Sequence, residues 1–350
     1  MPLTVLSVAY PLASVGPDTA GGAEQVLWAL DRALVRAGHR SLVIAQEGSR
    51  VAGELIATPM QPGPLTERAI RSGHAHLRAL LPHVLGREPI DLIHMHGLDF
   101  HAYMPPAGST ALVTLHLPPA YYPPGSLSPS RPRTWFNAVS RDQHRRLQPM
   151  SSLVEPIENG IPVEALQARH AKRGYALCLG RVCPEKGQHL ALEAAKQVDV
   201  PLLVAGEVFG YEAHESYFRK EILPRLDAQR RFIGPVGFAR KRRLLTAARC
   251  LLITSLVDET SSLVAREALA CGTPVIAFGR GALPETIAHG RTGYLVDSVG
   301  EMARAIRAAD GISPERCRAE ARDRFPEERM TARYLSLYRE LADQRRAGAA

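Results

Sequence analysis

The residues best suited to chemistry in this chain are two glutamates, Glu259 and Glu267, with seven residues between them. The surrounding pattern predicts a strand over residues 250–254, a loop that carries Glu259, and a helix over residues 262–270 that carries Glu267. A carboxylate on the loop after a parallel strand faces the crevice in which open α/β sheets bind ligands. The first N–H groups around the helix start lack intrahelical partners and can bind phosphate; they belong to Thr260, Ser261, Ser262 and Leu263. The segment could therefore bind a sugar, its phosphates and a ribose.

Two cations follow another predicted strand, over residues 175–179. Arg181 and Lys186 lie on the loop that leads to Gly187, where a helix over residues 188–198 is predicted to begin. The guanidinium of Arg181 offers a planar set of donors and the ammonium of Lys186 a mobile point charge. At the N-terminus of a helix, the two side chains are suited to binding a diphosphate.

Further candidates lie in the first half of the chain. Gly21 and Gly22 close the loop after the first predicted strand, and paired glycines let a backbone approach a ligand closely. His116 follows a predicted strand and could donate a hydrogen bond to a sugar hydroxyl or to a developing oxyanion. His96 lies at the tip of the preceding strand, whereas His94 continues that strand and is expected to be packed.

Strands and helices are predicted to alternate along both halves of the chain, which implies right-handed βαβ units around parallel sheets. The predicted strands cover residues 4–10, 41–45, 55–58, 90–94 and 111–115 in the first half, and residues 175–179, 201–205, 231–233, 250–254 and 274–277 in the second. A helix over residues 23–37 should end at Gly38. The proline-rich residues 117–133 are expected to form a long loop.

The bulk composition is that of a soluble globular protein of two domains: 350 residues, 45% hydrophobic and 22% charged. We expect neither a membrane-spanning helix nor a signal peptide. The five cysteines show no C-x-x-C spacing, so we expect them to be reduced core residues of a cytoplasmic protein. We expect no metal site. We attribute at least part of the net charge of +8 to surface arginines and expect no nucleic-acid partner. A dinucleotide-dependent oxidoreductase is not supported, because no G-x-G-x-x-G follows the first strand.

The segment from Ser255 to Ala277 resembles the E-x7-E motif of the retaining GT-B glycosyltransferases of family GT4. The flanking A-L-A-C-G-T-P-V-I-A and G-R-G-A-L-P-E-T-I-A-H-G-R-T-G-Y-L-V match that family in order and spacing. The run G-R-V-C-P-E-K-G is similar to the family's G-R-x-x-x-x-K-G, G-G-A-E to its G-G-x-E, and E-N-G-I to its P-N-G-[IV]. Thr260, Ser261 and Ser262 depart from the family, because many members have an aromatic residue and a glycine there.

The resemblance implies a GT-B fold of two Rossmann-like domains with the active site in the cleft between them. Residues 1–165 would form the acceptor-side domain, residues 166–326 the nucleotide-sugar-binding domain, and residues 327–350 a C-terminal helix that returns to the N-terminal domain. No cofactor is implied beyond a nucleoside-diphosphate sugar as co-substrate, expected to be a UDP-sugar.

The resemblance also implies roles for single residues. Arg181 and Lys186 would neutralise the leaving diphosphate in place of a metal, and Glu259 would orient the sugar hydroxyls. Glu267 would bind the ribose, and His116 would lie beside the reacting sugar. The loop over residues 232–236, with Val236, would contact the nucleotide base through its backbone.

The acceptor and the oligomeric state are left open by the sequence. Acceptor-side candidates are His96 and Arg71, which lies in a basic amphipathic segment over residues 66–87. Such a helix could contact the inner face of an anionic membrane, or it could pack in the domain with a solvated basic face. Residues 240–243 are expected to form a solvated basic helix start. Two other functions remain open, a UDP-sugar epimerase on the same fold and a basic binding protein without catalysis.

Overall fold

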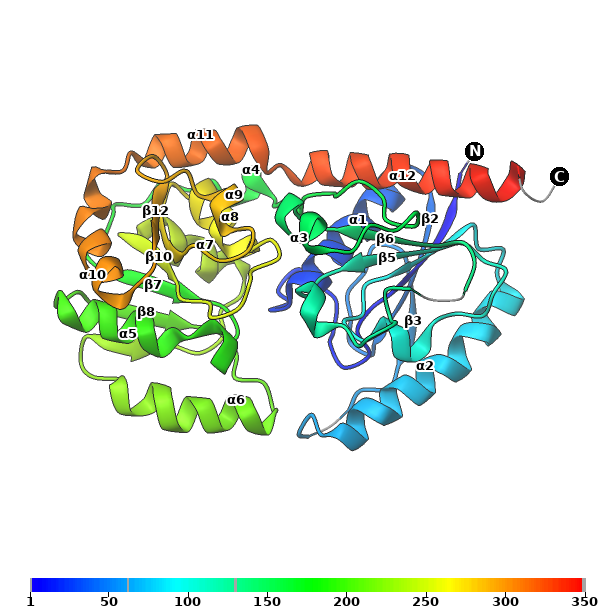
Figure 1. The fold of residues 1–350 in the computed structure, drawn as a ribbon, viewed down its shortest axis with the longest axis horizontal. Coiled ribbons are helices and arrows are strands. Elements are labelled where there is room, and N and C mark those ends of the chain that lie inside the picture. Colours follow the sequence, from blue (N-terminus) through cyan, green and yellow to red (C-terminus); the bar gives the residue numbers. More distant parts are fainter. Residues whose placement is uncertain (1, 62, 129–130, 348–350) are drawn as a thin grey trace. The chain divides into compact units, whose positions relative to one another are not determined.

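Strands and helices alternate along the whole chain, and a computed structural model describes them for residues 2–61, 63–128 and 131–347 (Figure 1). Their contacts divide the chain into two units. The first unit comprises Met1–Glu158 and Glu328–Ala350, and the second comprises Asn159–Glu327. No helix among the described residues is both long enough and apolar enough to cross a membrane.

The first unit is built on six parallel strands in the order β3-β2-β1-β4-β5-β6. The strands are β1 (Thr4–Val8), β2 (Arg40–Gln46), β3 (Glu54–Thr58), β4 (Leu92–Met95), β5 (Ala111–Leu115) and β6 (Thr134–Ala138). The strand order reverses between β1 and β4, and Val8 at the end of β1 pairs with Met95 at the end of β4. Open parallel sheets bind ligands at the carboxyl ends of the strands beside such a reversal.

Helices and short helical turns connect these strands. They are α1 (Gly22–Arg36), α2 (Glu67–Arg87), η1 (Phe100–Tyr103), η2 (Pro119–Tyr121), α3 (Arg141–Arg146) and the C-terminal α12 (Glu327–Ala347). Leu6, Ile93 and Val113 are fully buried in the sheet, as expected for strands covered on both faces. After Glu327, α12 belongs to the first unit, where Tyr334 and Tyr338 are completely buried.

The second unit repeats the same topology, with six parallel strands in the order β12-β11-β10-β7-β8-β9. The strands are β7 (Ala176–Leu179), β8 (Leu202–Ala205), β9 (Arg230–Phe232), β10 (Cys250–Ile253), β11 (Val275–Phe278) and β12 (Gly293–Val296). The sheet order reverses between β7 and β10, so the ends of these two strands are the expected ligand site. The prediction of an α/β fold built on two parallel sheets is confirmed.

The connecting helices of the second unit pack on both faces of its sheet. They are α4 (Val163–Leu166), η3 (Pro184–Lys186), α5 (Gln188–Gln197), α6 (Glu212–Tyr217), η4 (Phe218–Ile222), η5 (Leu223–Arg225), α7 (Phe238–Ala247), α8 (Leu263–Ala270), α9 (Leu283–Thr286), α10 (Val299–Ala308), η6 (Ala309–Gly311) and α11 (Pro314–Arg324). Ile161, Val163 and Leu166, next to the domain boundary expected at residues 165–166, are buried in the core of the second unit. All five cysteines are buried free thiols.

Candidate active site

The loop after β7 places both predicted cations at the point where the sheet of the second unit reverses. Gly187 ends this loop with a φ of +59°, and a Cβ there would lie 2.5 Å from the carbonyl oxygen of Thr254 at the end of β10. The Thr254 hydroxyl also donates to the Lys186 carbonyl oxygen over 3.0 Å. Glycine is therefore required for this close approach, which brings Lys186 against the end of β10.

Glu259 lies on the loop between β10 and α8 and binds the cation that the β7 loop presents. Lys186 Nζ donates to Glu259 Oε1 over 2.5 Å, and the Ser255 hydroxyl donates to the same oxygen. The glutamate is only 8% exposed. Burial raises its pKa. The opposing effects are larger, so the net shift of the pKa is downward; they come from the charge and hydrogen bond of Lys186, the Ser255 hydroxyl and the charge of Arg181. Glu259 is therefore an anion at neutral pH.

A second loop fixes the backbone of Glu259. The Ala282 N–H donates to the Glu259 carbonyl oxygen over 2.7 Å. At the neighbouring Gly281, with a φ of +59°, a Cβ would lie 2.3 Å from that oxygen. The carboxylate is thus positioned through its main chain as well as through Lys186.

The segment between Glu259 and α8 contains the predicted phosphate-binding groups. Ser262 has a φ of +50°, a left-handed conformation that costs a non-glycine residue about 1–3 kcal/mol, and α8 begins at the next residue, Leu263. The buried Ser261 hydroxyl has no hydrogen-bond partner among the described residues. Thr260 precedes it on the same loop. A strained backbone and an unsatisfied buried hydroxyl at the start of a helix are consistent with an anion-binding segment.

Glu267 lies one turn inside α8, where it is ion-paired as well. Lys241 Nζ of α7 donates to Glu267 Oε1 over 2.5 Å, and the two side chains are 15% and 5% exposed. The interpretation of residues 240–243 as a solvated helix start is wrong for Lys241, because this side chain turns inward over the Phe238 ring and neutralises a buried acid.

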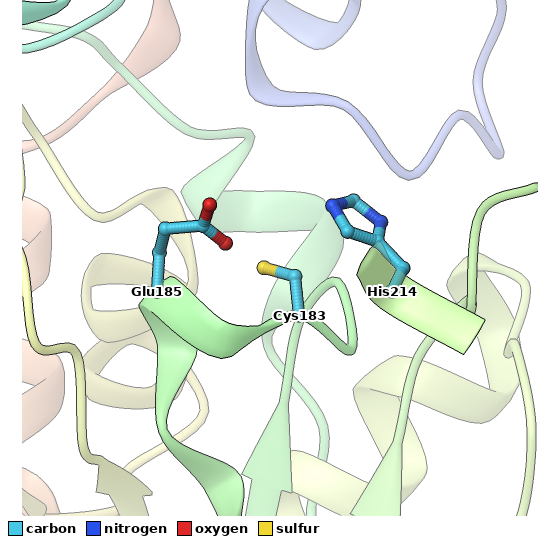
Figure 2. A group of neighbouring side chains, drawn as sticks. All are labelled: Cys183, Glu185 and His214. Atoms are coloured by element: carbon cyan, nitrogen blue, oxygen red, sulfur yellow. The ribbon is translucent and has the colours of Figure 1, made fainter. Parts of the chain in front are cut away.

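Three potential metal ligands lie beside the cation loop, at Cys183, Glu185 and His214 (Figure 2). One ligand atom from each lies within 4.8 Å of the others. Burial raises the pKa of the Cys183 thiol to about 11, so that the sulfur is protonated at neutral pH. Burial and the charge of Arg181 both lower the pKa of His214. Because a guanidinium close to the group opposes the binding of another cation, we assign no metal to it.

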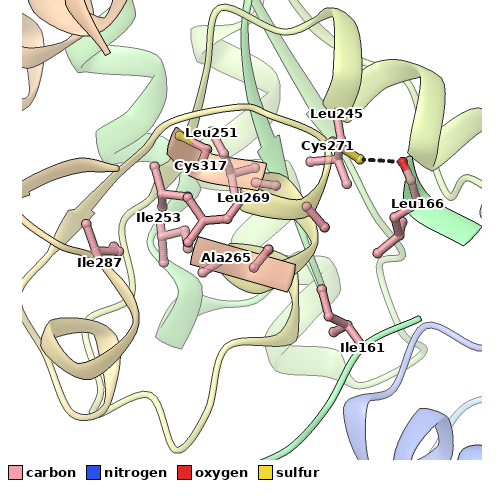
Figure 3. Packing of buried hydrophobic residues seen from close by; sticks show 14 of the residues in the cluster. Ile161, Leu166, Leu245, Leu251, Ile253, Ala265, Leu269, Cys271, Ile287 and Cys317 are labelled. Atoms are coloured by element: carbon pink, nitrogen blue, oxygen red, sulfur yellow. Dashed lines mark hydrogen bonds between the residues drawn. The ribbon is translucent and has the colours of Figure 1, made fainter. Parts of the chain in front are cut away.

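The apolar face of α8 fixes the helix that carries Glu267. Ala265 and Leu269 pack among Leu251, Ile253 and Ile287 (Figure 3). Just after the helix, the Cys271 thiol donates to the Leu166 carbonyl oxygen over 3.5 Å.

Arg266 on the same helix is a buried cation that the sequence analysis did not single out. It is 1% exposed, and its guanidinium lies 4.7 Å from the centre of the Phe325 ring. It donates to the carbonyl oxygen of Asn159, at the turn that begins the second unit. These contacts join α8 to Asn159 and Phe325, so we assign Arg266 a structural role in positioning α8.

Val236 and the predicted base-binding loop follow β9. Val236 is partly buried against the core, and Gly234 has a φ of +71° that lets its carbonyl oxygen accept from the Gly206 N–H over 3.0 Å. The loop is therefore anchored to the loop after β8, with the backbone shaped by glycines.

In the first unit, the predicted glycines stand at the start of α1. Gly22 is the first residue of α1, and a Cβ on Gly21 would lie 1.8 Å from a carboxylate oxygen of Glu24. Glu24 is buried, so the G-G-x-E run is a tight turn folded over its own acid. A larger residue at Gly21 would require the Glu24 carboxylate to move.

His116 follows β5 and is hydrogen-bonded to His96 at the end of β4, with 3.2 Å between His116 Nε2 and His96 Nδ1. His116 is half-buried, and burial lowers its pKa to about 3. His96 is 1% exposed, and its Nε2 lies 3.1 Å from Nδ1 of the fully buried His94. Because both ring nitrogens of His96 contact neighbouring histidines, we reassign this acceptor-side candidate to the support of His116.

Arg71 lies on the exposed face of α2 and pairs with Glu67 over 3.0 Å. The helix packs through Gly73, Leu77, Leu81 and Val84 and keeps most of its basic residues in solvent. The structure thus places Arg71 on a basic surface and brings it into no described contact with His96 or His116.

Comparison with known proteins assigns a family description to each part of the chain. Residues 20–164 match the model described as Glycosyltransferase Family 4, and residues 164–324 match the model described as Glycosyl transferases group 1. Together these matches cover residues 20–324, which include Lys186, Glu259 and Glu267.

Individual relatives are distant. A phosphatidyl-myo-inositol mannosyltransferase of Mycobacterium tuberculosis is 24% identical over 84% of each chain. The structure of AviGT4, a glycosyltransferase involved in avilamycin A biosynthesis, is 23% identical with a TM-score of 0.71 and covers 98% of each chain. Anabaena Alr3699/HepE in complex with UDP-glucose is 19% identical with a TM-score of 0.73, over 95% of this chain and 99% of that one. At these identities the structural likeness shows a shared GT-B fold.

Proposed function

The chain belongs to family GT4 of the GT-B glycosyltransferases, and on this basis we propose that it is a retaining enzyme that transfers a sugar from a UDP-sugar to a hydroxyl acceptor. The observation that carries the proposal is the pairing of Lys186 with Glu259 at the reversal point of the second sheet. This pairing sets a cation and an anion side by side at the start of α8. A nucleoside-diphosphate sugar requires both, a cation for its phosphates and an acceptor for its sugar hydroxyls.

The diphosphate would be bound by Arg181, Lys186 and the loop before α8. An ammonium has three donors, so Lys186 can keep its bond to Glu259 while it donates to a phosphate oxygen. The Ser261 hydroxyl would gain the partner that it lacks. These groups would stabilise the charge that develops on the leaving diphosphate, and we propose that no metal is needed for this.

Glu259 and Glu267 would bind the two sugars of the donor. Glu259 would orient the hydroxyls of the transferred sugar, and Glu267 would accept from the ribose hydroxyls. In the unliganded protein each carboxylate is paired with a lysine, Glu259 with Lys186 and Glu267 with Lys241.

We propose that substitution occurs on one face of the anomeric carbon. The bond from this carbon to the diphosphate oxygen breaks, and the bond to the acceptor oxygen forms on the same side. The acceptor's proton passes to the leaving diphosphate. His116 would contact the reacting sugar in this arrangement.

The acceptor is proposed only as a class. The phosphatidyl-inositol substrate in the name of the mycobacterial relative and the exposed basic face of α2 together suggest an anionic or inositol-containing hydroxyl compound. Peripheral contact of α2 with an anionic membrane would follow if that compound is a lipid.

A panel of nucleotide sugars, read by thermal shift, tests donor binding. The donor that stabilises the protein is then incubated with acceptors that include inositol, inositol phosphate and phosphatidylinositol vesicles. We expect a glycosylated product whose anomeric configuration, read by NMR, is that of the donor. Lys186→Met should reduce the donor shift, while Lys196→Met, at an exposed position of α5, should leave it unchanged.

Other outcomes of this panel would support other functions. A 2-epimer formed from the donor alone would identify an epimerase. Stabilisation by a donor without turnover across the acceptor panel would support a binding protein, and an inverted product would refute retention.

A further inference from the structure

A chain of hydrogen bonds in the first unit leads from His116 into the core. His116 contacts His96 over 3.2 Å, and His96 contacts His94 over 3.1 Å. His94 then has two hydroxyl partners: Thr114 of β5, 2.7 Å from its Nε2, and Tyr338 of α12, 2.6 Å from its Nδ1. Residues far apart in the sequence thus contact one imidazole.

The position of each proton in this hydrogen-bond series follows from its buried end, at Thr114 and Asn137. The Thr114 hydroxyl donates to Asn137 Oδ1 over 2.7 Å, and Asn137 Nδ2 donates to the Tyr334 hydroxyl over 2.9 Å. A hydroxyl has one proton to donate, so Thr114 must accept from its other neighbours. Between Thr114 and His94, the proton therefore belongs to Nε2 of the histidine.

Burial makes the inner two histidines neutral. His94 and His96 are 0% and 1% exposed, and burial lowers the pKa of each well below its usual value. A neutral imidazole has one N–H and one lone pair. With its proton on Nε2, His94 presents the lone pair of Nδ1 to Tyr338 and to His96.

The same constraint passes outward to His116. His96 Nε2 faces the lone pair of His94 and must be protonated, because two facing lone pairs repel. His96 Nδ1 then carries a lone pair and accepts from His116 Nε2. His116, neutral because of its own burial, has its only proton directed at His96.

We propose that Thr114 and His94, acting through His96, hold His116 as the Nε2–H tautomer, so that His116 Nδ1 accepts a hydrogen bond from a sugar hydroxyl. Thr114, His94 and His96 are positioning residues. The assignment excludes the alternative that His116 donates to an oxyanion, because its proton is already used. The link to a sugar rests on the proposed function, whereas the tautomer does not.

The test compares two variants, each of which removes one of the two hydroxyl groups that hydrogen-bond to the His94 ring. Thr114→Val keeps the shape of the side chain but removes the acceptor of the His94 Nε2 proton. An unsatisfied buried donor is costly, so the proton should move to Nδ1, where the Tyr338 oxygen can accept it. The donor and acceptor roles then reverse in the hydrogen bonds that join the three histidines, and His116 becomes the Nδ1–H tautomer. Tyr338→Phe removes a donor to Nδ1 and should leave the tautomers unchanged, and Thr114→Ser should keep them as well.

The tautomers are read from ring-nitrogen NMR shifts of protein labelled with ¹⁵N-histidine, with His116→Gln used for assignment. We expect protonated Nε2 in all three histidines of the wild type, Tyr338→Phe and Thr114→Ser, and protonated Nδ1 of His116 in Thr114→Val. With an active donor–acceptor pair, Thr114→Val should lower kcat about tenfold, the effect of one lost hydrogen bond of about 1.4 kcal/mol, with little change in nucleotide Kd.

A protonated Nδ1 on His116 in the wild type would overturn the proposal, whether or not the valine variant folds. The same tautomer in Thr114→Val and Tyr338→Phe would also overturn it. If the shifts are as expected but neither Thr114→Val nor His116→Gln alters kcat, the relay stands and the role of His116 in sugar transfer fails.

Discussion

Lys186→Met should destabilise the second unit as well as weaken donor binding. The substitution removes an ammonium 2.5 Å from Glu259 Oε1 and leaves a carboxylate in a site that is 8% exposed. Removing one partner of a buried ion pair typically costs 3–5 kcal/mol, and because the Lys186 side chain is 28% exposed we expect about 3 kcal/mol. The binding free energy for a nucleoside diphosphate should also weaken by about 1.5–3 kcal/mol, because one charge-assisted hydrogen bond to phosphate is lost.

The pH dependence of this loss identifies its cause. In the wild type, the net pKa shift of Glu259 is downward, so the stability it contributes is present above the unfolded pKa of about 4.3 and is lost as pH falls through the folded pKa. Without Lys186, burial is less opposed and the folded pKa should rise above the unfolded one. The penalty in Lys186→Met should therefore be largest at neutral pH and shrink as acid protonates Glu259.

The assay must measure the stability of the second unit separately from that of the first. Both tryptophans, Trp28 and Trp135, lie in the first unit, so their fluorescence does not follow the site. Hydrogen exchange of peptides from β7 and β10, measured from pH 7 to about 4.5, gives the local unfolding free energy instead. Lys196→Met is the matched control. An equal loss at both ends of the pH range, or full additivity between Lys186→Met and Glu259→Gln, would refute the reasoning.

Three further predictions concern the same site. Activity should survive EDTA, because in the proposed mechanism Arg181 and Lys186 neutralise the diphosphate; activity lost in EDTA and restored by Mg²⁺ or Mn²⁺ would contradict this. Glu259→Gln should reduce kcat more than nucleotide affinity, and Glu267→Gln should do the reverse, since ribose contacts are alike in ground and transition states; matching kcat and Kd profiles would show that the roles are wrong. Ser261→Ala should leave the unliganded protein as stable or more stable, since a buried unsatisfied hydroxyl disappears, yet weaken nucleoside-diphosphate binding in a calorimetric titration; unchanged affinity would remove Ser261 from the site.

Most of the fold could be predicted from the sequence because its buried strands are short apolar runs separated by helical patterns. Two strands were missed. β6 (Thr134–Ala138) follows a proline-rich loop and contains polar Thr134 and Asn137, and β12 (Gly293–Val296) is a four-residue strand that begins with glycine. In both cases the neighbouring strand supplies the pairing that the local sequence does not specify.

The site residues could be predicted where topology alone brings them together. Arg181, Lys186 and Glu259 each follow a strand, and the carboxyl ends of parallel strands meet at one edge. The partner of Glu267 could not be predicted, because α7 and α8 meet only through tertiary packing and Lys241 lies in a run of four basic residues. The contact between His94 and Tyr338 spans 244 residues of sequence and has no local signal.

The motif glutamates of the second unit and His116 of the first are buried in different ways, and the proposed chemistry gives a reason for the difference. In the second unit, Glu259 and Glu267 are each paired with a lysine, which suits the proposed binding of a polar donor. In the first unit, burial lowers the pKa of His116 to about 3 and keeps it neutral. In glycosyl transfer the anomeric carbon gains positive character in the transition state, and a protonated histidine beside it would be repulsive. A neutral imidazole can orient a hydroxyl without that penalty. His116 should therefore contribute no break to a kcat profile between pH 5 and 8, although an ordinary histidine would titrate in that range.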